Sequence, residues 1–252
     1  MRGWWREISG LVLPVSCAGC GTPRVELCER CGAELCGRAP RRARPAPEPP
    51  GLPVVHAAAA YEDAVRAVLL AHKERGALGL AGALGRALAA AVRAGAGRGT
   101  TTGRPREVGP LLLVPVPSAR RAVAARGHDP TRRIALAAAG ELRRGGVAAR
   151  VVPVLRQRRA VADQAGLGAR QRLANLAGAL EVVPGGERLL ADGRAVLVDD
   201  LMTTGASLAE AARALGAARG HADGTAEDGR SRGQAAVVAV SPSAFEINRN
   251  SL

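Results

Sequence analysis

Short apolar runs alternate with amphipathic segments along most of the chain after residue 53. The runs have the length of buried strands, and the segments between them repeat apolar residues at helical spacing. We expect strands over 57–61, 111–116, 151–155, 180–183, 194–198 and 235–240, and helices over 62–72, 78–93, 131–144, 169–176 and 207–219. Alternating strands and helices imply right-handed crossovers. The predicted fold is therefore α/β, with a mostly parallel sheet flanked by helices.

Proline, glycine and arginine mark the joints between the parts of the chain. The stretch 39–53 is rich in proline and arginine, which is typical of a stiff or extended connector. It separates a cysteine-rich module over 1–38 from a main domain over 54–252. Two further stretches, 95–110 and 220–233, have the composition of surface loops.

The most informative stretch, 195–208, contains an apolar run, two acids, a hydroxyl-rich loop and the start of a helix. Asp199 and Asp200 follow the apolar run directly. Ligands of parallel sheets bind at the carboxyl ends of the strands, where these acids would accept hydrogen bonds from sugar hydroxyls. The loop offers hydroxyls and helix N-terminal amides, which suit a phosphate. It consists of Thr203, Thr204, Gly205, Ala206 and Ser207. The stretch predicts a ribose 5-phosphate site, with an ordinary strand–turn–helix as the alternative.

Two arginine-bearing segments are expected beside this site. After the run 111–116 come Ser118, Arg120 and Arg126, and arginines with a small hydroxyl residue suit a pyrophosphate group. The segment 156–175 joins two expected strands, and a flexible basic segment can close over a phosphorylated ligand and exclude water. Its candidate residues are Arg156, Arg158, Gln164, Arg172 and Asn175. A solvated basic surface is the alternative for both segments.

All five cysteines of the chain lie between positions 17 and 36. Cys17 with Cys20 and Cys28 with Cys31 form two Cys-x-x-Cys pairs, which is the spacing of two thiolate knuckles around one Zn²⁺. The module has few residues for a core of its own, so metal binding would supply most of its folding free energy. Disulfides in a secreted domain are the alternative, which the lack of cysteine elsewhere disfavours. Cys36 is left over, as a spare thiol or the remnant of a second metal ribbon.

Composition limits the core and the partners. Aromatic residues make up only 2% of the chain, so the core must be built from alanine, valine and leucine. The formal net charge is +14, and Lys73 is the one lysine among the basic residues, so arginine supplies nearly all the positive charge. Such an excess fits a nucleic-acid partner, anionic small substrates or compositional drift.

The N-terminus allows two interpretations. Two arginines precede the apolar run 8–15, as in a lipoprotein-type signal that would end at Cys20. The run is short, contains Pro14 and follows Glu7, so export is disfavoured. The apolar segment 77–94 is interrupted by arginines, and no membrane span is predicted. We therefore expect a cytoplasmic protein.

The stretch 195–208 resembles the phosphoribosyl pyrophosphate (PRPP) binding motif of type I phosphoribosyltransferases. The whole layout is similar to the ComF family, competence-associated proteins that join an N-terminal zinc ribbon to a phosphoribosyltransferase domain. The carriers of this resemblance are the four paired cysteines, the stretches 73–76, 114–117, 126–129 and 199–207, and Gln164, Arg172 and Asn175. Family members commonly show Arg-Gly-Phe-Asn-Gln where this chain has Arg-Gly-His-Asp-Pro at 126–130.

The resemblance implies that PRPP binds with Mg²⁺ at Asp199, Asp200 and the loop 203–207. In enzymes that share the motif, a nucleophile displaces pyrophosphate from C1 of PRPP. We therefore expect transfer of ribose 5-phosphate to an acceptor that the sequence does not specify, and one structural zinc. The alternative is a non-catalytic accessory protein of DNA uptake that binds single-stranded DNA or competence proteins and keeps the PRPP fold as a sensor or relic. Scarce aromatic residues weigh against it, because single strands normally stack on aromatic rings.

Overall fold

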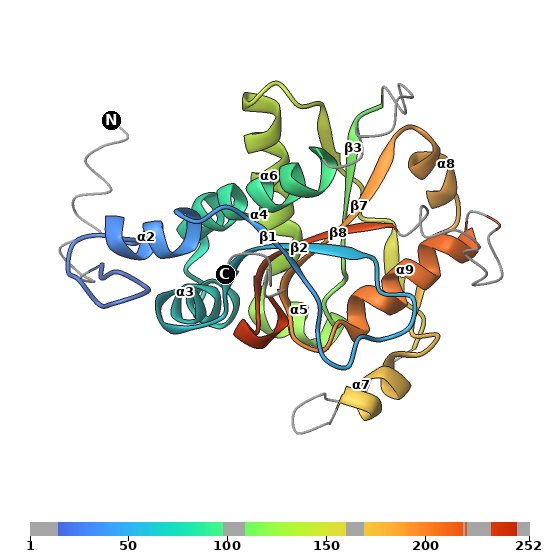
Figure 1. Ribbon diagram of the computed structural model, residues 1–252, viewed down its shortest axis with the longest axis horizontal. Helices are drawn as coiled ribbons and strands as arrows, with labels where there is room; N and C mark the ends of the chain where they lie inside the picture. The colour runs from blue at the N-terminus through green and yellow to red at the C-terminus, as the bar shows by residue number, and fades with distance from the viewer. Residues whose placement is uncertain (1–14, 98–108, 160–168, 219, 221–232, 246–252) are drawn as a thin grey trace, which may run out of the picture.

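The computed structural model describes residues 15–97, 109–159, 169–218, 220 and 233–245 (Figure 1). A six-stranded sheet runs through it in the order β1-β2-β8-β7-β3-β4. These strands are β1 (Arg41–Ala43), β2 (Val54–Ala60), β3 (Leu111–Pro115), β4 (Ala149–Val151), β7 (Arg194–Met202) and β8 (Gln234–Val240). Neighbouring strands are parallel except for β1 with β2. The predicted α/β fold with a mostly parallel sheet is confirmed.

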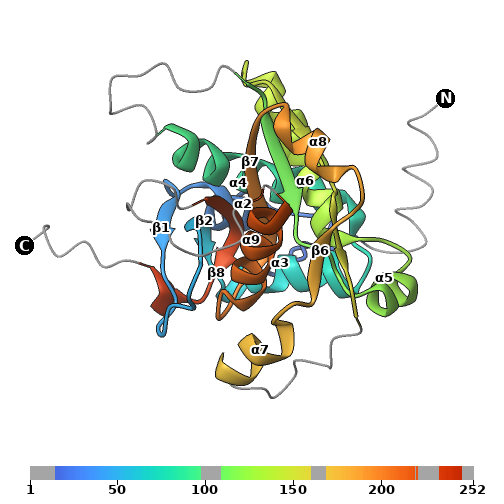
Figure 2. The same ribbon diagram turned by 90° about the vertical axis from the view of Figure 1, so that its right-hand side faces the viewer.

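Helices cover both faces of the sheet (Figure 2). One face packs against α3 (Asp63–Glu74), α4 (Ala81–Ala96) and α6 (Pro130–Arg144), and the other against α9 (Ala206–Ala218). Further helices are α2 (Glu29–Cys36), α5 (Arg120–Arg126), α7 (Ala169–Leu176) and α8 (Gly186–Ala191), with 3₁₀ turns at Leu78–Leu80 and Pro242–Ala244. A separate antiparallel pair joins β5 (Leu155–Gln157) to β6 (Leu180–Val182).

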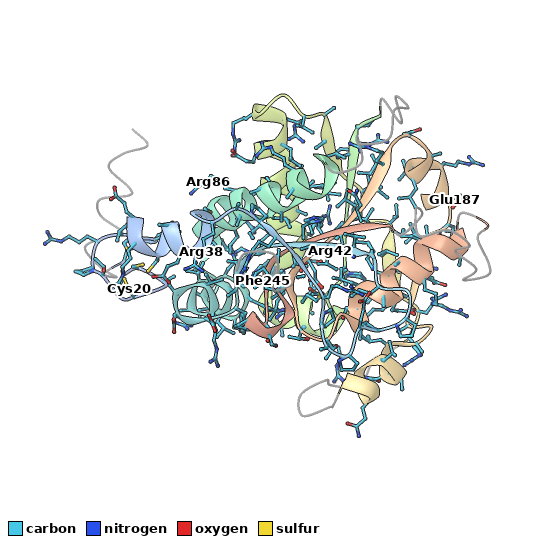
Figure 3. The ribbon with its side chains drawn as sticks, viewed as in Figure 1. Cys20, Arg38, Arg42, Arg86, Glu187 and Phe245 are labelled. Atoms are coloured by element: carbon cyan, nitrogen blue, oxygen red, sulfur yellow. The ribbon has the colours of Figure 1, made fainter. Side chains whose placement is uncertain are left out.

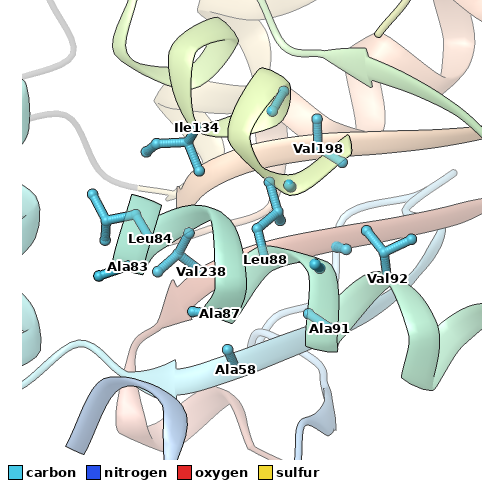
Figure 4. Close-up of a cluster of buried hydrophobic side chains, with 14 of the residues drawn as sticks. Ala58, Ala83, Leu84, Ala87, Leu88, Ala91, Val92, Ile134, Val198 and Val238 are labelled. Atoms are coloured by element: carbon cyan, nitrogen blue, oxygen red, sulfur yellow. The ribbon is translucent and has the colours of Figure 1, made fainter. Parts of the chain in front are cut away.

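The core between α4, α6 and the sheet is built from small and branched aliphatic side chains, as the scarcity of aromatic residues predicted. Figure 4 shows Leu88 of α4 with Ile134 of α6 and Val198 of β7 in this cluster. The two helices approach closely at Gly85, where an added Cβ would lie 2.5 Å from the Cβ of Ala137. Only glycine fits there, and the close packing holds α6 against the sheet, with its first turn near the end of β7.

Several element boundaries differ from the sequence prediction. β7 continues through the two acids to Met202, whereas the apolar run predicted an end at 198. The predicted strand 151–155 is divided between β4 and β5, because Pro153 has no N–H to donate to a neighbouring strand. α5 occupies a stretch for which only a loop was expected, and α8 was not predicted.

The described residues that precede β2 pack against the main domain. Within the Pro/Arg-rich connector, β1 pairs with β2, and Ala43 forms a bridge to Phe245 after the last strand. The guanidinium of Arg41 lies 4.1 Å from the centre of the Phe245 ring, a cation–π contact. Leu35 of α2 is 1% exposed and belongs to the core around α4. The cysteine-bearing segment is therefore anchored to the sheet through α2.

Among the described residues, none of the helices combines the length and the apolar character that crossing a bilayer requires.

Candidate functional site

The two acids of the strand–loop–helix stretch lie at the carboxyl end of β7, between β8 and β3 in the sheet. Asp200 is buried and Asp199 is partly buried. Oδ1 of Asp199 accepts a hydrogen bond of 2.8 Å from the N–H of Asp200 and one of 3.4 Å from the hydroxyl of Thr131. Because Thr131 lies in the first turn of α6, that helix helps to orient the Asp199 carboxylate.

Lys73, in the last turn of α3, is the ion-pair partner of Asp200. Its Nζ lies 2.8 Å from Oδ2 of Asp200, and the two side chains are 35% and 6% exposed. Sequence reasoning did not assign Lys73 to the site, because the contact joins residues 127 positions apart. Two signals in the sequence pointed to it: the stretch 73–76 carries part of the family resemblance, and Lys73 is the single lysine in an arginine-rich chain.

Burial and charge make the two acids unequal. Burial raises the pKa of Asp199 well above its usual value, and the negative charge of Asp200 raises it further. Burial also lowers the pKa of Lys73, but attraction to Asp200 and Asp199 outweighs burial and leaves that pKa raised. Lys73 therefore stays charged and neutralises Asp200, while Asp199 resists ionisation. Such a pair can both accept hydrogen bonds from a sugar diol and donate one to it.

The predicted phosphate loop follows β7 and leads into α9. Gly205 has φ of +77°, a left-handed conformation that glycine adopts without strain. An added Cβ at this position would lie 3.0 Å from Cδ1 of Leu52 and 3.3 Å from Cγ of Pro45. The Pro/Arg-rich connector thus packs against the bend, and both the conformation and the space require glycine there.

Asp199 and the loop line one hollow of about 30 Å³, together with Leu201 and Met202. A second hollow of about 100 Å³ shares Thr203 and Thr204 with the first. It is lined by Pro45, Ala46, Pro47, Thr203, Thr204, Ser241, Ser243 and Ala244. The smaller hollow has room for about one water molecule. A phosphate group would therefore extend from it into the second hollow or into solvent beside the exposed Thr203.

The first arginine-bearing segment, 118–126, lies mostly in α5. Ser118 is partly buried ahead of this helix, and Arg120 is exposed in its first turn. Arg126, at its end, is 15% exposed and donates from Nη1 to Oε1 of Glu74 at 2.9 Å. Arg126 thus contacts Glu74, the residue that follows Lys73 in α3. Of the three predicted pyrophosphate residues, it is the one whose described contact reaches α3.

His128 links α3 to the turn between α5 and α6. Its Nε2 lies 3.2 Å from the carbonyl of His72, and its Nδ1 lies 3.1 Å from the carbonyl of Arg126. The two imidazole rings meet edge to face at 5.8 Å. These contacts to backbone carbonyls give His128 a positioning role for the α3–α5 pair.

The structure describes only part of the second arginine-bearing segment, 156–175. Arg156 and Arg158 pair with Glu181 across the β5–β6 sheet, at 2.9 and 3.5 Å. In α7, the carbonyl of Asn175 accepts a hydrogen bond from Arg159 at 2.8 Å. Gln164 and the side chain of Arg172 lie outside the described residues. Among the described contacts, none joins these residues to the acids, and closure of this segment over a ligand stays a prediction.

The four paired cysteines form a compact cluster at the end of the molecule where Figure 3 labels Cys20. Their Sγ atoms all lie within 4.8 Å of one another, and the Sγ atoms of Cys20 and Cys28 are 3.6 Å apart. A tetrahedral zinc with Zn–S bonds of about 2.3 Å needs sulfurs about 3.8 Å apart. The N–H of Cys28 donates to Sγ of Cys17 at 3.3 Å. The cluster has the size and the donor set to hold one metal ion.

The surroundings of the cluster favour thiolates on the exposed side. Hydrogen bonds from Thr22 lower the pKa of Cys20 to about 6. Burial raises the pKa of Cys31, and the neighbouring thiols raise it further. A cation in the centre of the cluster would offset the repulsion between neighbouring thiolates. Gly19 closes the first knuckle, and an added Cβ there would lie 2.7 Å from Sγ of Cys31, so this position has no room for a side chain.

Cys36 does not belong to the cluster. It lies at the end of α2, where its Sγ is 3.7 Å from the carbonyl oxygen of Ala83, and burial raises its pKa. Four cysteines and one metal ion are therefore the arrangement that the described residues support.

A comparison with protein-family models and with curated protein sequences finds no match to this chain. The family resemblance rests on the residues of the chain itself.

Proposed function

We propose that the protein is a ComF-like phosphoribosyltransferase, which binds PRPP with Mg²⁺ and transfers ribose 5-phosphate to an acceptor. One observation carries the proposal: the acid Asp199 and the loop 203–207 line the same hollow at the carboxyl end of β7. Sugar hydroxyls and a phosphate of one ligand would need to meet these two groups side by side, and ligands of parallel sheets bind at this edge.

Each part of the ligand has a matching group in this arrangement. The ribose hydroxyls would pair with Asp199 and Asp200. The 5-phosphate would accept hydrogen bonds from Thr203, Thr204 and the amides at the start of α9. The diphosphate would lie towards Ser118 and Arg126, which follow the neighbouring strand β3.

The chemistry would be a displacement at C1 of the ribose. The acceptor's lone pair forms the new bond to C1 as the C1–O bond breaks. The electron pair of the C1–O bond leaves with pyrophosphate. Positive charge develops on the ring, and the acids on the hydroxyls would stabilise it electrostatically. Mg²⁺ would be held mainly by diphosphate and hydroxyl oxygens, since it keeps waters and needs few protein ligands. The protein's part is therefore positioning and electrostatics.

The cysteine cluster would hold structural Zn²⁺. A closed set of four thiolates leaves no open coordination position for a substrate. Zn²⁺ binding would stabilise the cysteine-bearing segment, and α2 would couple that segment to the main domain because its Leu35 is part of the core.

Turnover of isotope-labelled PRPP against a panel of purines, pyrimidines and amines tests the proposal. The expected result is acceptor-dependent release of labelled pyrophosphate. Absence of both PRPP binding and turnover would refute the proposal. Salt-dependent binding of single-stranded DNA by the same preparation would then favour the DNA-uptake alternative.

A further inference from the structure

Lys73 has a position that an ordinary surface lysine does not have. Its Nζ lies 2.8 Å from Oδ2 of Asp200, a carboxylate that is only 6% exposed. About a third of the Lys73 side chain is exposed, so the ammonium joins the buried acid to solvent at the carboxyl end of β7. An ammonium has three N–H donors, and this ion pair uses one of them. The group can therefore contact Asp200 and a ligand anion, or exchange one for the other.

A second cation lies close to Lys73 and is also incompletely paired. The side chain of Arg126 is 15% exposed and pairs with Glu74, the residue that follows Lys73 in the chain. Nη1 of Arg126 bonds to Glu74, whereas its Nε is buried without a partner among the described residues. His128 fixes α3 to the end of α5 and holds the two cations in this arrangement.

Two neighbouring, partly buried cations are costly in free energy unless each of them pairs with an anion. Asp200 and Glu74 supply that anion in the described arrangement. A sugar that brings hydroxyl groups to Asp200 would supply its hydrogen bonds in place of Lys73. The freed ammonium would then need another anion within reach.

We propose that Lys73 is a diphosphate-binding residue that exchanges its ion pair with Asp200 for a contact to the ligand. The proposal rests on the proposed function and names a residue that the PRPP motif does not include. In this arrangement Lys73 and Arg126 share the diphosphate from two helices, while Asp200 turns to the ribose hydroxyls. A lysine suits the exchange because its compact ammonium rotates freely, whereas a guanidinium pairs in a fixed fork.

The first test uses the wild-type chain and needs no substitution. Lys73 is the only lysine, so an amine-acylating reagent modifies Nζ of Lys73 and the chain's α-amino group, which serves as the internal reference. Mass spectrometry of the two peptides gives their relative labelling rates. Pyrophosphate with Mg²⁺ is expected to slow labelling of Lys73 at least about 10-fold, the loss expected when a charged hydrogen bond covers the amine. Ribose 5-phosphate is expected to increase the rate by releasing Lys73 from Asp200.

The second test separates ligand binding from a merely structural ion pair. Lys73→Met is compared with Arg66→Met, which removes one positive charge from the exposed face of the same helix. By calorimetric titration, Lys73→Met is expected to lose about 10- to 100-fold in affinity for pyrophosphate with Mg²⁺ and to keep its affinity for ribose 5-phosphate. A structural defect would weaken both ligands together. Lys73→Arg keeps the charge but pairs in a fixed fork, so it is expected to recover only part of the pyrophosphate affinity.

The outcomes are distinguishable from failure of the proposed function. If wild-type protein binds PRPP and Lys73→Met binds pyrophosphate as tightly as Arg66→Met does, the role of Lys73 is refuted while the proposed function stands. Equal losses for pyrophosphate and ribose 5-phosphate would also refute it, because Lys73 would then only support the acids. If wild-type protein binds none of the three ligands, both proposals fail.

Discussion

The N–H of Asp200 donates a 2.8 Å hydrogen bond to Oδ1 of Asp199, yet this bond does not keep Asp199 readily ionised. Burial raises the pKa of Asp199, the charge of Asp200 adds to the effect, and Lys73 opposes it. A ligand that brings hydrogen-bond donors or a cation to Asp199 must therefore compete with its proton. Both stability and ligand binding should respond to that proton.

Asp199→Asn is expected to make the protein more stable than wild type above mildly acidic pH. Because the folded-state pKa of Asp199 is raised, the unfolded chain releases this proton first, and wild-type stability falls as pH rises from about 3.9 through the folded-state pKa. Asparagine has no such proton, so the difference in free energy of unfolding should grow across that window. Urea denaturation across this pH range measures it.

Asp192→Asn is the matched control for that experiment. Asp192 pairs with Arg150 at 2.8 Å, and both side chains are well exposed. Its replacement should change stability by a small and nearly constant amount. An equally constant difference for Asp199→Asn would show that the acid is not perturbed by folding.

PRPP with Mg²⁺ is expected to raise the melting temperature of the wild-type protein. A ligand at about 100 times its Kd adds about 2.7 kcal/mol, which for a chain of this size corresponds to about 5–10 °C. Replacing Asp199 and Asp200 together by asparagine should abolish the shift, because the ribose hydroxyls lose the charged acceptor at Asp200 and the carboxyl group at Asp199. Differential scanning fluorimetry measures this, with Asp192→Asn again as the control. A double variant that keeps the full shift would remove the acids from the ligand site.

The features that the sequence predicted are local ones. The apolar run before Asp199 indicates a buried strand, and the glycine and hydroxyls that follow indicate a bend and a helix start, whatever the rest of the chain does. The same holds for the cysteine pairs, whose spacing alone predicts a cluster, and Cys17, Cys20, Cys28 and Cys31 do converge. The end of β7 was missed because polar residues ended the apolar pattern, although the backbone of Asp199 and Leu201 still pairs with β8.

The contacts that sequence reasoning did not find depend on how distant elements pack. Lys73 meets Asp200, and Arg126 meets Glu74, only after α3 and α5 have docked at the same edge of the sheet. Arg126 and Arg120 are both in α5, yet Arg126 is partly buried in an ion pair and Arg120 is exposed. The edge strand β1 was not predicted either. Its Pro/Arg-rich composition indicates a connector, whereas in the structure it pairs with β2.

Cys20→Ser is expected to lower the zinc content from one per chain to well below that value. Cys20 is the most exposed of the four ligands, and serine is a poor donor to Zn²⁺, so the closed tetrahedral set is lost. Cys36→Ser is the control, because Cys36 lies outside the cluster and should leave the zinc content unchanged. Elemental analysis of the purified variants measures both. Full zinc content in Cys20→Ser would contradict the assignment of this ligand.

The last prediction concerns Glu210 of α9, the helix that begins at the phosphate loop. Oε1 of Glu210 accepts a 2.9 Å hydrogen bond from the N–H of Leu180 in β6, and Arg213 donates to the carbonyl of Leu180 at 2.9 Å. Burial tends to raise the pKa of Glu210, but hydrogen bonds from Arg213 and Leu180 outweigh it and leave that pKa lowered. The pair therefore clamps β6 to the helix that presents the loop.

Glu210→Ala is expected to cost about 2–3 kcal/mol of unfolding free energy, because the buried N–H of Leu180 loses its acceptor. Glu210→Gln keeps an acceptor and should cost about 1 kcal/mol, since the ion pair with the half-exposed Arg213 is worth little. Because the folded-state pKa of Glu210 is lowered, its contribution is present above about pH 4.3 and disappears as pH falls through the folded-state pKa. Urea denaturation measures these costs, with Glu187→Ala on exposed α8 as the control (Figure 3). Equal stability of Glu210→Ala and Glu187→Ala would mean that the clamp does not hold β6.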